Sequence, residues 1–410
     1  MNWLPPPGRF IIPESQIHYM IRNAKLYPHY NARGDPGLKA KVWTLKGFFS
    51  ASVPAGASKG AHEARKIDFK KNFELFPTFV NNIIGLDETD WITADRMIMQ
   101  TDGTDDFSRL GADMALAFSI AIARAGSDGE LWRMEGPKSK VYFPYPLSNV
   151  IGGGLHGGKP AWQEFMVLPH RAKDPEEAMN TVIEIWKVIG EELEKKKILL
   201  GRNIENAWMC DLDELKALSF LADIAADWNV RLGVDFAASS FWDGKSYVYR
   251  NMKRRMSPEE QLQHVADLAR QYNIYYLEDP FHEEDFGMFA ALQKMLSNRL
   301  VVGDDLYCTN EDRLTTGLRA RASRGMIMKP NQAGVLYKAF KAAEAARQSG
   351  VAPIASHRSA ETNDDWLADL ALLWKSPIIK IGCLGFDQAK HNRLIELWHD
   401  VPNNVMAELP

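Results

Sequence analysis

Six apolar, strand-like runs in the second half of the chain each end on a charged residue. The first three end on the acids Asp235, Glu278 and Asp304, and the next three on Lys329, the pair His357 and Arg358, and Lys380. A single acid in such a place is usually a helix N-cap, and a single lysine is usually a solvated surface residue. Six charged ends in order, acids before bases, instead predict one shared site.

These residue types indicate a definite chemistry. Three carboxylates without an intervening cysteine or histidine suit Mg²⁺, which prefers oxygen ligands and leaves positions for water and substrate. Two lysines and an arginine facing that ion suit an anionic substrate. A lysine beside a metal and another cation can have its pKa lowered enough to act as a general base.

The elements that position these residues begin near residue 144. Short apolar runs alternate with long helical patterns over 144–410, which predicts repeated βα units and a parallel sheet. A closed (β/α)8 barrel is the economical arrangement for this many strands, and its carboxyl strand ends meet at one mouth. A doubly wound sheet is disfavoured because no GxGxxG turn follows a first strand.

The first part of the chain predicts a different layout. Residues 1–20 are proline-rich and are expected to form a surface extension. Residues 21–143 predict a smaller α+β domain, with strands up to about residue 51 and helices after residue 61, including the apolar DMALAFSIAIARAG. The expected fold is therefore a small N-terminal domain joined to an α/β barrel.

Composition excludes several classes of protein. The chain has 410 residues, 46% hydrophobic and 25% charged, as expected for a soluble globular protein. A formal net charge of −4 disfavours general nucleic-acid binding and anionic membranes. The three cysteines have no CxxC spacing, and there is neither an 18-residue apolar run nor a signal-peptide pattern. We expect a soluble protein of the reducing cytoplasm.

The segment SASVPAGASKG at 50–60 is a glycine-rich loop with one lysine. It lacks the GK[ST] ending and the Walker spacing of a nucleotide P-loop. Its glycines permit mobility and close approach of the backbone, as expected of a turn or of a lid over a phosphate group.

Several segments spread along the chain resemble the enolase family. The matching segments run in the same order along the chain from about residue 21 to residue 395, and residues 1–20 match nothing in the family. They are NARGDP (31–36), ASVPAGASKGAHEA (51–64), RLGADMALAFSIAIARA (109–125), NVIGGGLHGG (149–158), QEFMVLP (163–169), GVDFAAS (233–239), YLEDPF (276–281), VVGDDLYCTN (301–310), MKPNQAG (328–334), SHRSAET (356–362) and IKIG (379–382).

The resemblance implies a small α+β lid domain on a modified enolase-type barrel, Mg²⁺ dependence, and usually a homodimer. The implied reaction is that of a carbon–oxygen hydro-lyase, the reversible dehydration of 2-phosphoglycerate to phosphoenolpyruvate. Enolase-superfamily sites use a Lys or His base, with Mg²⁺ stabilising the intermediate.

By resemblance, each site residue has an implied role. Asp235, Glu278 and Asp304 would hold the first Mg²⁺, and Lys329 would be the base with Lys380 beside the substrate carboxylate. Arg358 and Ser359 would hold the phosphate, with Ala55, Gly56 and Ser58 in the lid. The leaving-hydroxyl side would be lined by His156, Gln163, Glu164 and His357, with Glu205 as general acid.

The chain departs from the family pattern at several of these places. The family general acid lies in a Gly-Asp-Glu-Gly-Gly segment, which here reads GRNIENAWMCD, with Glu205 nearest in position. Ala55 replaces a serine whose hydroxyl helps to hold a second Mg²⁺, so that second ion is left open. Gly154-Leu155-His156 replaces Gly-Ser-His, and FDQAKHN at 386–392 replaces Glu-Arg-Leu-Ala-Lys-Tyr-Asn.

Three hypotheses follow. The chain is a true enolase, or a paralogue that acts on a related phosphorylated or phosphonylated three-carbon acid. Carboxyphosphonoenolpyruvate synthase of phosphonate natural-product biosynthesis is an example of such a paralogue. The third possibility is a non-catalytic binding protein on an enolase frame. The presence of Lys329, Lys380 and the three acids counts against it, because a protein without activity has no physical need to bury groups of like charge together.

Overall fold

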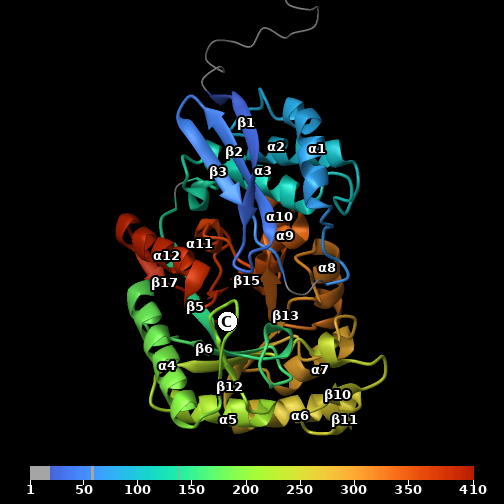
Figure 1. Ribbon diagram of the computed structural model, residues 1–410, viewed down its shortest axis with the longest axis vertical. Coiled ribbons are helices and arrows are strands. Elements are labelled where there is room, and N and C mark those ends of the chain that lie inside the picture. Colours follow the sequence, from blue (N-terminus) through green and yellow to red (C-terminus); the bar gives the residue numbers. More distant parts are fainter. Residues whose placement is uncertain (1–18, 57–59, 137) are drawn as a thin grey trace, which may run out of the picture.

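The computed structural model describes residues 19–56, 60–136 and 138–410. Most of the predicted N-terminal extension and Ser58 of the predicted lid therefore lie outside the described residues. The described chain forms two domains, with the N-terminal one above the barrel in Figure 1.

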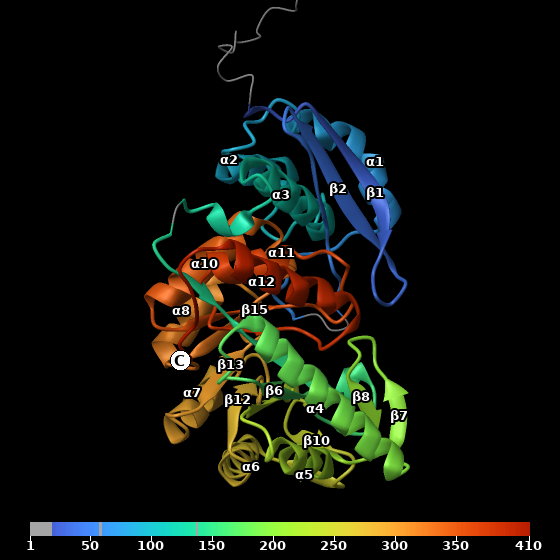
Figure 2. The same cartoon turned by 90° about the vertical axis from the view of Figure 1, so that its left-hand side faces the viewer.

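The N-terminal domain is a three-stranded antiparallel sheet covered by helices on one side (Figures 1 and 2). Its strands are β1 (Asn23–Tyr30), β2 (Pro36–Thr44) and β3 (Gly47–Ser52), and its helices are α1 (Phe69–Phe79), α2 (Trp91–Asp102) and α3 (Ala112–Gly126). Almost every residue of α3 is buried, because this apolar helix packs on β2 and β3 and forms the centre of the domain. The helix predicted from DMALAFSIAIARAG is confirmed.

The second domain is a closed barrel of eight strands, which confirms the predicted fold class. In barrel order these are β5 (Tyr145–Gly152), β6 (Glu164–Leu168), β9 (Arg231–Asp235), β12 (Ile274–Glu278), β13 (Leu300–Gly303), β14 (Gly325–Met328), β15 (Ala352–Ser356) and β16 (Ile378–Lys380). Pairing of β16 with β5 closes the ring.

The prediction of a parallel sheet is wrong for one strand. Strand β6 runs antiparallel to both neighbours, β5 and β9. The reason is local: residues 153–163 join β5 to β6 without a crossover helix, and a parallel pair requires such a crossover. Reversal places the start of β6, rather than its end, at the mouth, where Glu164 pairs in register with Asp235.

Helices surround the barrel (Figure 2), and several short strands outside the ring pair with one another or with β5. The helices are α4 (Pro175–Lys195), α5 (Glu214–Ala225), α6 (Pro258–Gln271), α7 (Phe286–Met295), α8 (Glu311–Ala320), α9 (Pro330–Ala333), α10 (Leu336–Gln348), α11 (Trp366–Leu373) and α12 (Gln388–Asp400). The remaining strands are β4 (Val141–Phe143), β7 (Leu199–Arg202), β8 (Trp208–Cys210), β10 (Tyr247–Tyr249), β11 (Arg254–Met256) and β17 (Asn404–Met406). Across the described ranges, no helix is both long enough and apolar enough to span a membrane.

The two domains are joined by backbone and side-chain contacts at the mouth of the barrel. Ala55 and Ala360 form an antiparallel bridge, with N···O distances of 3.0 and 2.9 Å. Beside it, the Ser52 N–H donates to Asp364 (2.8 Å), and the Trp366 indole N–H donates to the Ser52 carbonyl (3.0 Å). These contacts place the start of the predicted lid directly over the strand ends.

Candidate functional site

The charged strand ends meet in one small cavity between the two domains. Its volume is about 20 Å³, room for about one water molecule, because charged side chains fill the mouth. Residues that line it are Gly56, His156, Gln163, Glu164, Glu205, Asp235, Lys329, Ser356, His357, Arg358, Ser359 and Lys380. Except for Ser356, each of these is a residue singled out in the sequence.

Strands β6, β9 and β12 place three carboxylates in one row. Glu164 is paired with Asp235, and Asp235 with Glu278, in the register of neighbouring strands. The ammonium of Lys380 reaches all three, at 3.0 Å from Glu164, 2.9 Å from Asp235 and 2.8 Å from Glu278. The structure thus brings the two predicted ligands Asp235 and Glu278 together around a lysine.

Asp304 and Lys329 form a second ion pair beside the first. The other Asp304 oxygen accepts a hydrogen bond from the Gln332 amide (3.2 Å), so both oxygens are bound. Burial alone would favour the neutral amine of Lys329, but Asp304 outweighs it and raises the pKa of the lysine. The predicted base and the third predicted metal ligand are therefore in direct contact, which favours the protonated lysine, so the role of Lys329 as base stays a prediction.

The carboxylates provide a direct test of whether a divalent cation fits. Burial, with Asp235 next in effect, raises the pKa of Glu278 to about 8. The shift reflects loss of solvent first and then the neighbouring negative charge of Asp235, which Lys380 only partly offsets. Carboxylate oxygens are the ligands that Mg²⁺ prefers, so the chemistry of Asp235, Glu278 and Asp304 suits the ion, and their role as its ligands stays a prediction.

The predicted ligands are not the most tightly gathered acids of the described residues. Ligand atoms lie within 4.8 Å of one another in two other groups: Asp279 with Asp304 and Asp305, and His156 with Glu164 and Glu205. In the first group, Asp279 accepts the backbone N–H groups of Asp304 (2.9 Å) and Asp305 (2.8 Å). Asp279 therefore positions the turn after β13.

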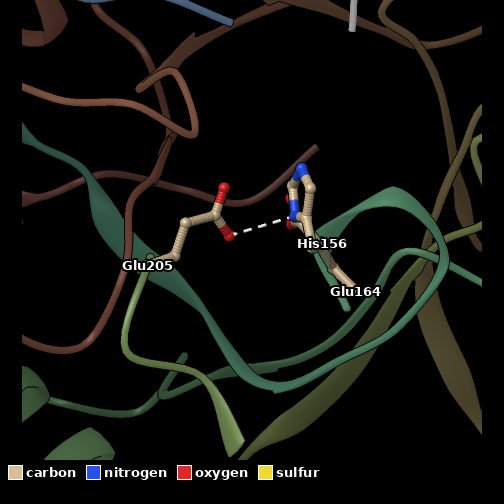
Figure 3. Close-up of side chains that lie close together, drawn as sticks. All are labelled: His156, Glu164 and Glu205. Carbon is tan, nitrogen blue, oxygen red and sulfur yellow. Dashed lines mark ion pairs between the residues drawn. The ribbon is translucent and has the colours of Figure 1, made fainter. Parts of the chain in front are cut away.

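The second group, drawn in Figure 3, forms one wall of the cavity. The Nδ1 atom of His156 lies 3.3 Å from Glu205 and 3.5 Å from Glu164, and the Asn149 amide donates to Glu205 at 3.0 Å. Burial lowers the pKa of His156, but the two carboxylates outweigh it and leave the pKa raised. This wall is therefore an ionised histidine–carboxylate cluster.

Glu205 and Glu164 differ in their electrostatic surroundings. Burial works against ionisation of Glu205, but His156, with further contributions from His357 and Asn149, leaves its pKa well below the usual range. Burial raises the pKa of Glu164 against the pull of Lys380. A general acid must carry a proton, so the surroundings of Glu205 favour its ionised form, and its predicted role stays a prediction.

The lid side of the cavity is organised around Arg358. Its guanidinium is buried and pairs with Glu63, at 3.1 Å from Nη1 and 3.3 Å from Nη2. Gly56 lies so close that an added Cβ would overlap the guanidinium, so a larger residue at this position would have to displace Arg358. Ser359 lines the same cavity, and Ala55 lies at its edge in the bridge to Ala360.

Sequence reasoning missed several residues that hold the site together. Glu63, Asn331 and Gln332 lie within quoted segments (ASVPAGASKGAHEA and MKPNQAG), so their proximity to the site was readable from the sequence. Asp387 lies in the quoted segment FDQAKHN, but nothing in the sequence pairs it with His357, whose Nδ1 atom is 2.9 Å away. Its pairing depends on the tertiary fold alone.

Comparisons with known proteins agree with this architecture. Residues 21–133 match the family model for the enolase N-terminal domain, and residues 140–407 match the enolase C-terminal TIM barrel domain. An enolase of Methanothermobacter thermautotrophicus is 34% identical over 95% of this chain and 99% of its own length. An enolase of Pyrobaculum aerophilum is 38% identical over 85% of this chain and 87% of its own. The chain belongs to the enolase family of hydro-lyases.

Proposed function

We propose that the protein dehydrates 2-phosphoglycerate reversibly to phosphoenolpyruvate, with Mg²⁺ as its cofactor. The observation that carries this proposal is that Lys329, Lys380 and Arg358 converge with a row of buried carboxylates in one cavity. Such a site can bind a doubly anionic acid and take the proton next to its carboxylate. The named enolases that resemble the chain support the same reaction.

The substrate would lie with its phosphate toward the lid and its carboxylate toward Lys380. Arg358 offers a planar fork suited to phosphate, beside Ser359 and Gly56. Lys380 is held by three carboxylates, which keeps an ammonium at the position of the substrate carboxylate. The hydroxyl group to be lost would face His156, Gln163, Glu164, Glu205 and His357.

The chemistry needs a base and a proton donor. Lys329 removes the α-proton, and the electron pair of that C–H bond forms a carbon–carbon double bond as the β-hydroxyl group leaves. The departing oxygen takes a proton from an acidic group on the leaving-hydroxyl side of the cavity and leaves as water. Charged groups placed where negative charge develops supply much of the rate enhancement.

The magnesium ion would be held by Asp235, Glu278 and Asp304. When bound, it supplies positive charge that stabilises the negative charge building up on the substrate carboxylate. A second ion fits less well: Ala55 has no hydroxyl group, and its carbonyl oxygen already accepts the Ala360 N–H at 2.9 Å. One magnesium ion is therefore proposed.

The homodimer and the cytoplasmic location stay predictions.

A second candidate is a paralogue acting on a related phosphorylated or phosphonylated three-carbon acid. The observation that favours it is Leu155, a 60% exposed side chain in the loop before β6. It lines a cavity of about 280 Å³ beside Gln163 and Asp235. An apolar group next to the reaction centre would suit a substrate with a changed substituent.

The test is an assay of the purified protein with Mg²⁺ and 2-phosphoglycerate, following the absorbance of phosphoenolpyruvate. We expect turnover that Lys329→Ala lowers about 1,000-fold. The matched control is Lys338→Ala on α10, since Lys338 donates to the Asp105 carbonyl away from the site (2.9 Å). No turnover, with Lys329-dependent exchange of the α-proton into deuterated water, would favour the paralogue. Loss of both with Mg²⁺ still bound would favour a non-catalytic binding protein.

A further inference from the structure

Asp387 is a buried carboxylate that has no part in the function proposed above. It ends a short 3-10 turn (Gly385–Asp387) directly before α12 and is 3% exposed. Its Oδ2 atom lies 2.9 Å from the Nδ1 atom of His357, across 30 residues of sequence. Asp387 also belongs to FDQAKHN, a segment in which the chain departs from the family sequence.

The pair determines which nitrogen of His357 faces the reaction. Because Nδ1 is engaged by Asp387, Nε2 is the nitrogen left for the cavity that His357 lines together with Glu164 and Glu205. The Gly382 N–H also points at Nδ1, at 3.3 Å, as a donor that would require Nδ1 to accept. The Asp387 contact is shorter and carries a charge, so Nδ1 acts as the donor.

We propose that His357, oriented by Asp387, donates the proton to the leaving hydroxyl group. This inference rests on the proposed dehydration and assigns the proton donor that the sequence resemblance gave to Glu205. His357 is the catalytic residue and Asp387 the positioning residue.

Charged groups face His357 from several elements. They are the carboxylates of Asp387 before α12, Glu205 between β7 and β8, and Glu164 on β6, and the cations Lys390 on α12, His156 before β6, and Lys380 on β16. His391 on α12 is also near, and burial lowers its pKa. Burial would lower the pKa of His357 as well, but Asp387, then Glu205 and Glu164, outweigh it and raise that pKa to about 9.

Asp387 is itself held in the ionised form. Burial opposes its charge, but His357 and Lys390 outweigh burial and lower its pKa. Lys390 Nζ lies 3.8 Å from Asp387 Oδ1 and donates to Glu361 at 2.8 Å. A neutral His357 would leave two buried negative charges, Asp387 and Glu205, with less compensation, so the site favours the imidazolium.

The step balances in protons and electrons. Lys329 accepts the α-proton, the C–H electron pair becomes the new double bond, and the C–O bond breaks with its electrons on oxygen. That oxygen takes the Nε2 proton of His357 and leaves as water. Lys329 must enter this step as the neutral amine, which requires the effect of Asp304 on its pKa to be offset in the loaded site. His357 ends neutral and Lys329 ends protonated, so exchange of protons with solvent returns both to their starting states.

The test compares pH profiles of kcat for the full-length wild type, Asp387→Asn, Asp387→Glu and His357→Gln. We expect kcat of the wild type to fall at high pH with a midpoint near pH 9. In Asp387→Asn this midpoint should be at least one pH unit lower, and Asp387→Glu should partly restore it. His357→Gln should lose about 100-fold or more in kcat, while Lys329-dependent α-proton exchange remains in each variant. Asp369→Asn, which alters a buried carboxylate paired with Arg393 outside the site (2.9 Å), is the control and should leave the profile unchanged.

A second measurement does not depend on turnover or on any variant that might fold poorly. Nitrogen-15 NMR of the wild-type imidazole groups should show His357 still protonated above pH 8. Titration of His357 near pH 6.5 or below would overturn the proposal. An unchanged basic limb in Asp387→Asn would overturn it as well, as would loss of dehydration in Glu205→Gln but not in His357→Gln. If the wild type shows no turnover while His357 is still protonated above pH 8, the role of His357 as proton donor is rejected together with the proposed function. Only the role of Asp387 in orienting His357 then stands.

Discussion

Glu63 and Arg358 form a buried ion pair across the domain boundary, with 3.1 Å between Oε2 and Nη1. Glu63 belongs to the N-terminal domain and Arg358 follows strand β15 of the barrel. The Gln332 amide also donates to Glu63, at 3.3 Å, and connects this pair to Asp304. Lid position and the arrangement of charges in the site are therefore coupled.

The first prediction concerns this pair. Glu63→Gln should lower the free energy of unfolding by about 1–3 kcal/mol, because it leaves a buried guanidinium without its carboxylate. Urea unfolding followed by tryptophan fluorescence measures the change. The control is Glu284→Gln, which alters a half-exposed pair with His62 and Arg313 and should cost less than about 1 kcal/mol. Equal losses in the two variants would contradict the coupling.

The second prediction tests the close approach of Gly56 to Arg358. Gly56→Ala should raise KM for the phosphorylated substrate about tenfold, since overpacking costs about 1–3 kcal/mol and displaces the guanidinium. Steady-state kinetics provide the measurement. Gly287→Ala in α7 meets its nearest atom at 3.5 Å and should change nothing. A normal KM in Gly56→Ala would show that Arg358 does not hold the phosphate.

The third prediction separates the two groupings of acids around Asp304. Glu278→Gln should raise the Mg²⁺ concentration for half-maximal activity about tenfold or more, whereas Asp305→Asn should have a much smaller effect. Removal of metal with a chelator should abolish turnover, and added Mg²⁺ should restore it. The reverse ranking of the two variants would place the ion among Asp279, Asp304 and Asp305 instead.

The fourth prediction uses pH. Burial raises the pKa of Asp95 to about 7, although its carboxylate accepts the Tyr337 N–H at 2.7 Å. A folded-state pKa above the unfolded value of 3.8 means that stability falls as pH rises from about 4 to about 7. Asp95→Asn should therefore be more stable than the wild type by about 2–4 kcal/mol at pH 8, and the gain should vanish near pH 4.

Urea unfolding at pH 4, 6 and 8 checks this prediction. Asp90→Asn serves as the control at the N-cap of the same helix, where hydrogen bonds from Thr93 lower the pKa of the carboxylate. It should bring no gain at pH 8. A constant difference between Asp95→Asn and the wild type at every pH would rule out Asp95 as the titrating group.

Much of the barrel could be predicted because its strands are short apolar runs that end on charged residues. Asp235, Glu278 and Lys380 were placed by that pattern alone, and the structure puts all three in contact. The reversal of β6 could not be predicted, since an alternation of strands and helices does not show strand direction. The Asp387–His357 pair was also hidden, because a contact across 30 residues requires the folded chain.

The reversed strand β6 has a consequence for how this protein can change over evolution. An antiparallel neighbour is joined by a loop, so residues 153–163 at the catalytic end pack without a crossover helix of their own. Within this loop, the side chain of Leu155 is 60% exposed, so a substitution at that position need not disturb the outer helices. Leu155 is thus a position beside the site whose side chain can change while the fold of the barrel is preserved.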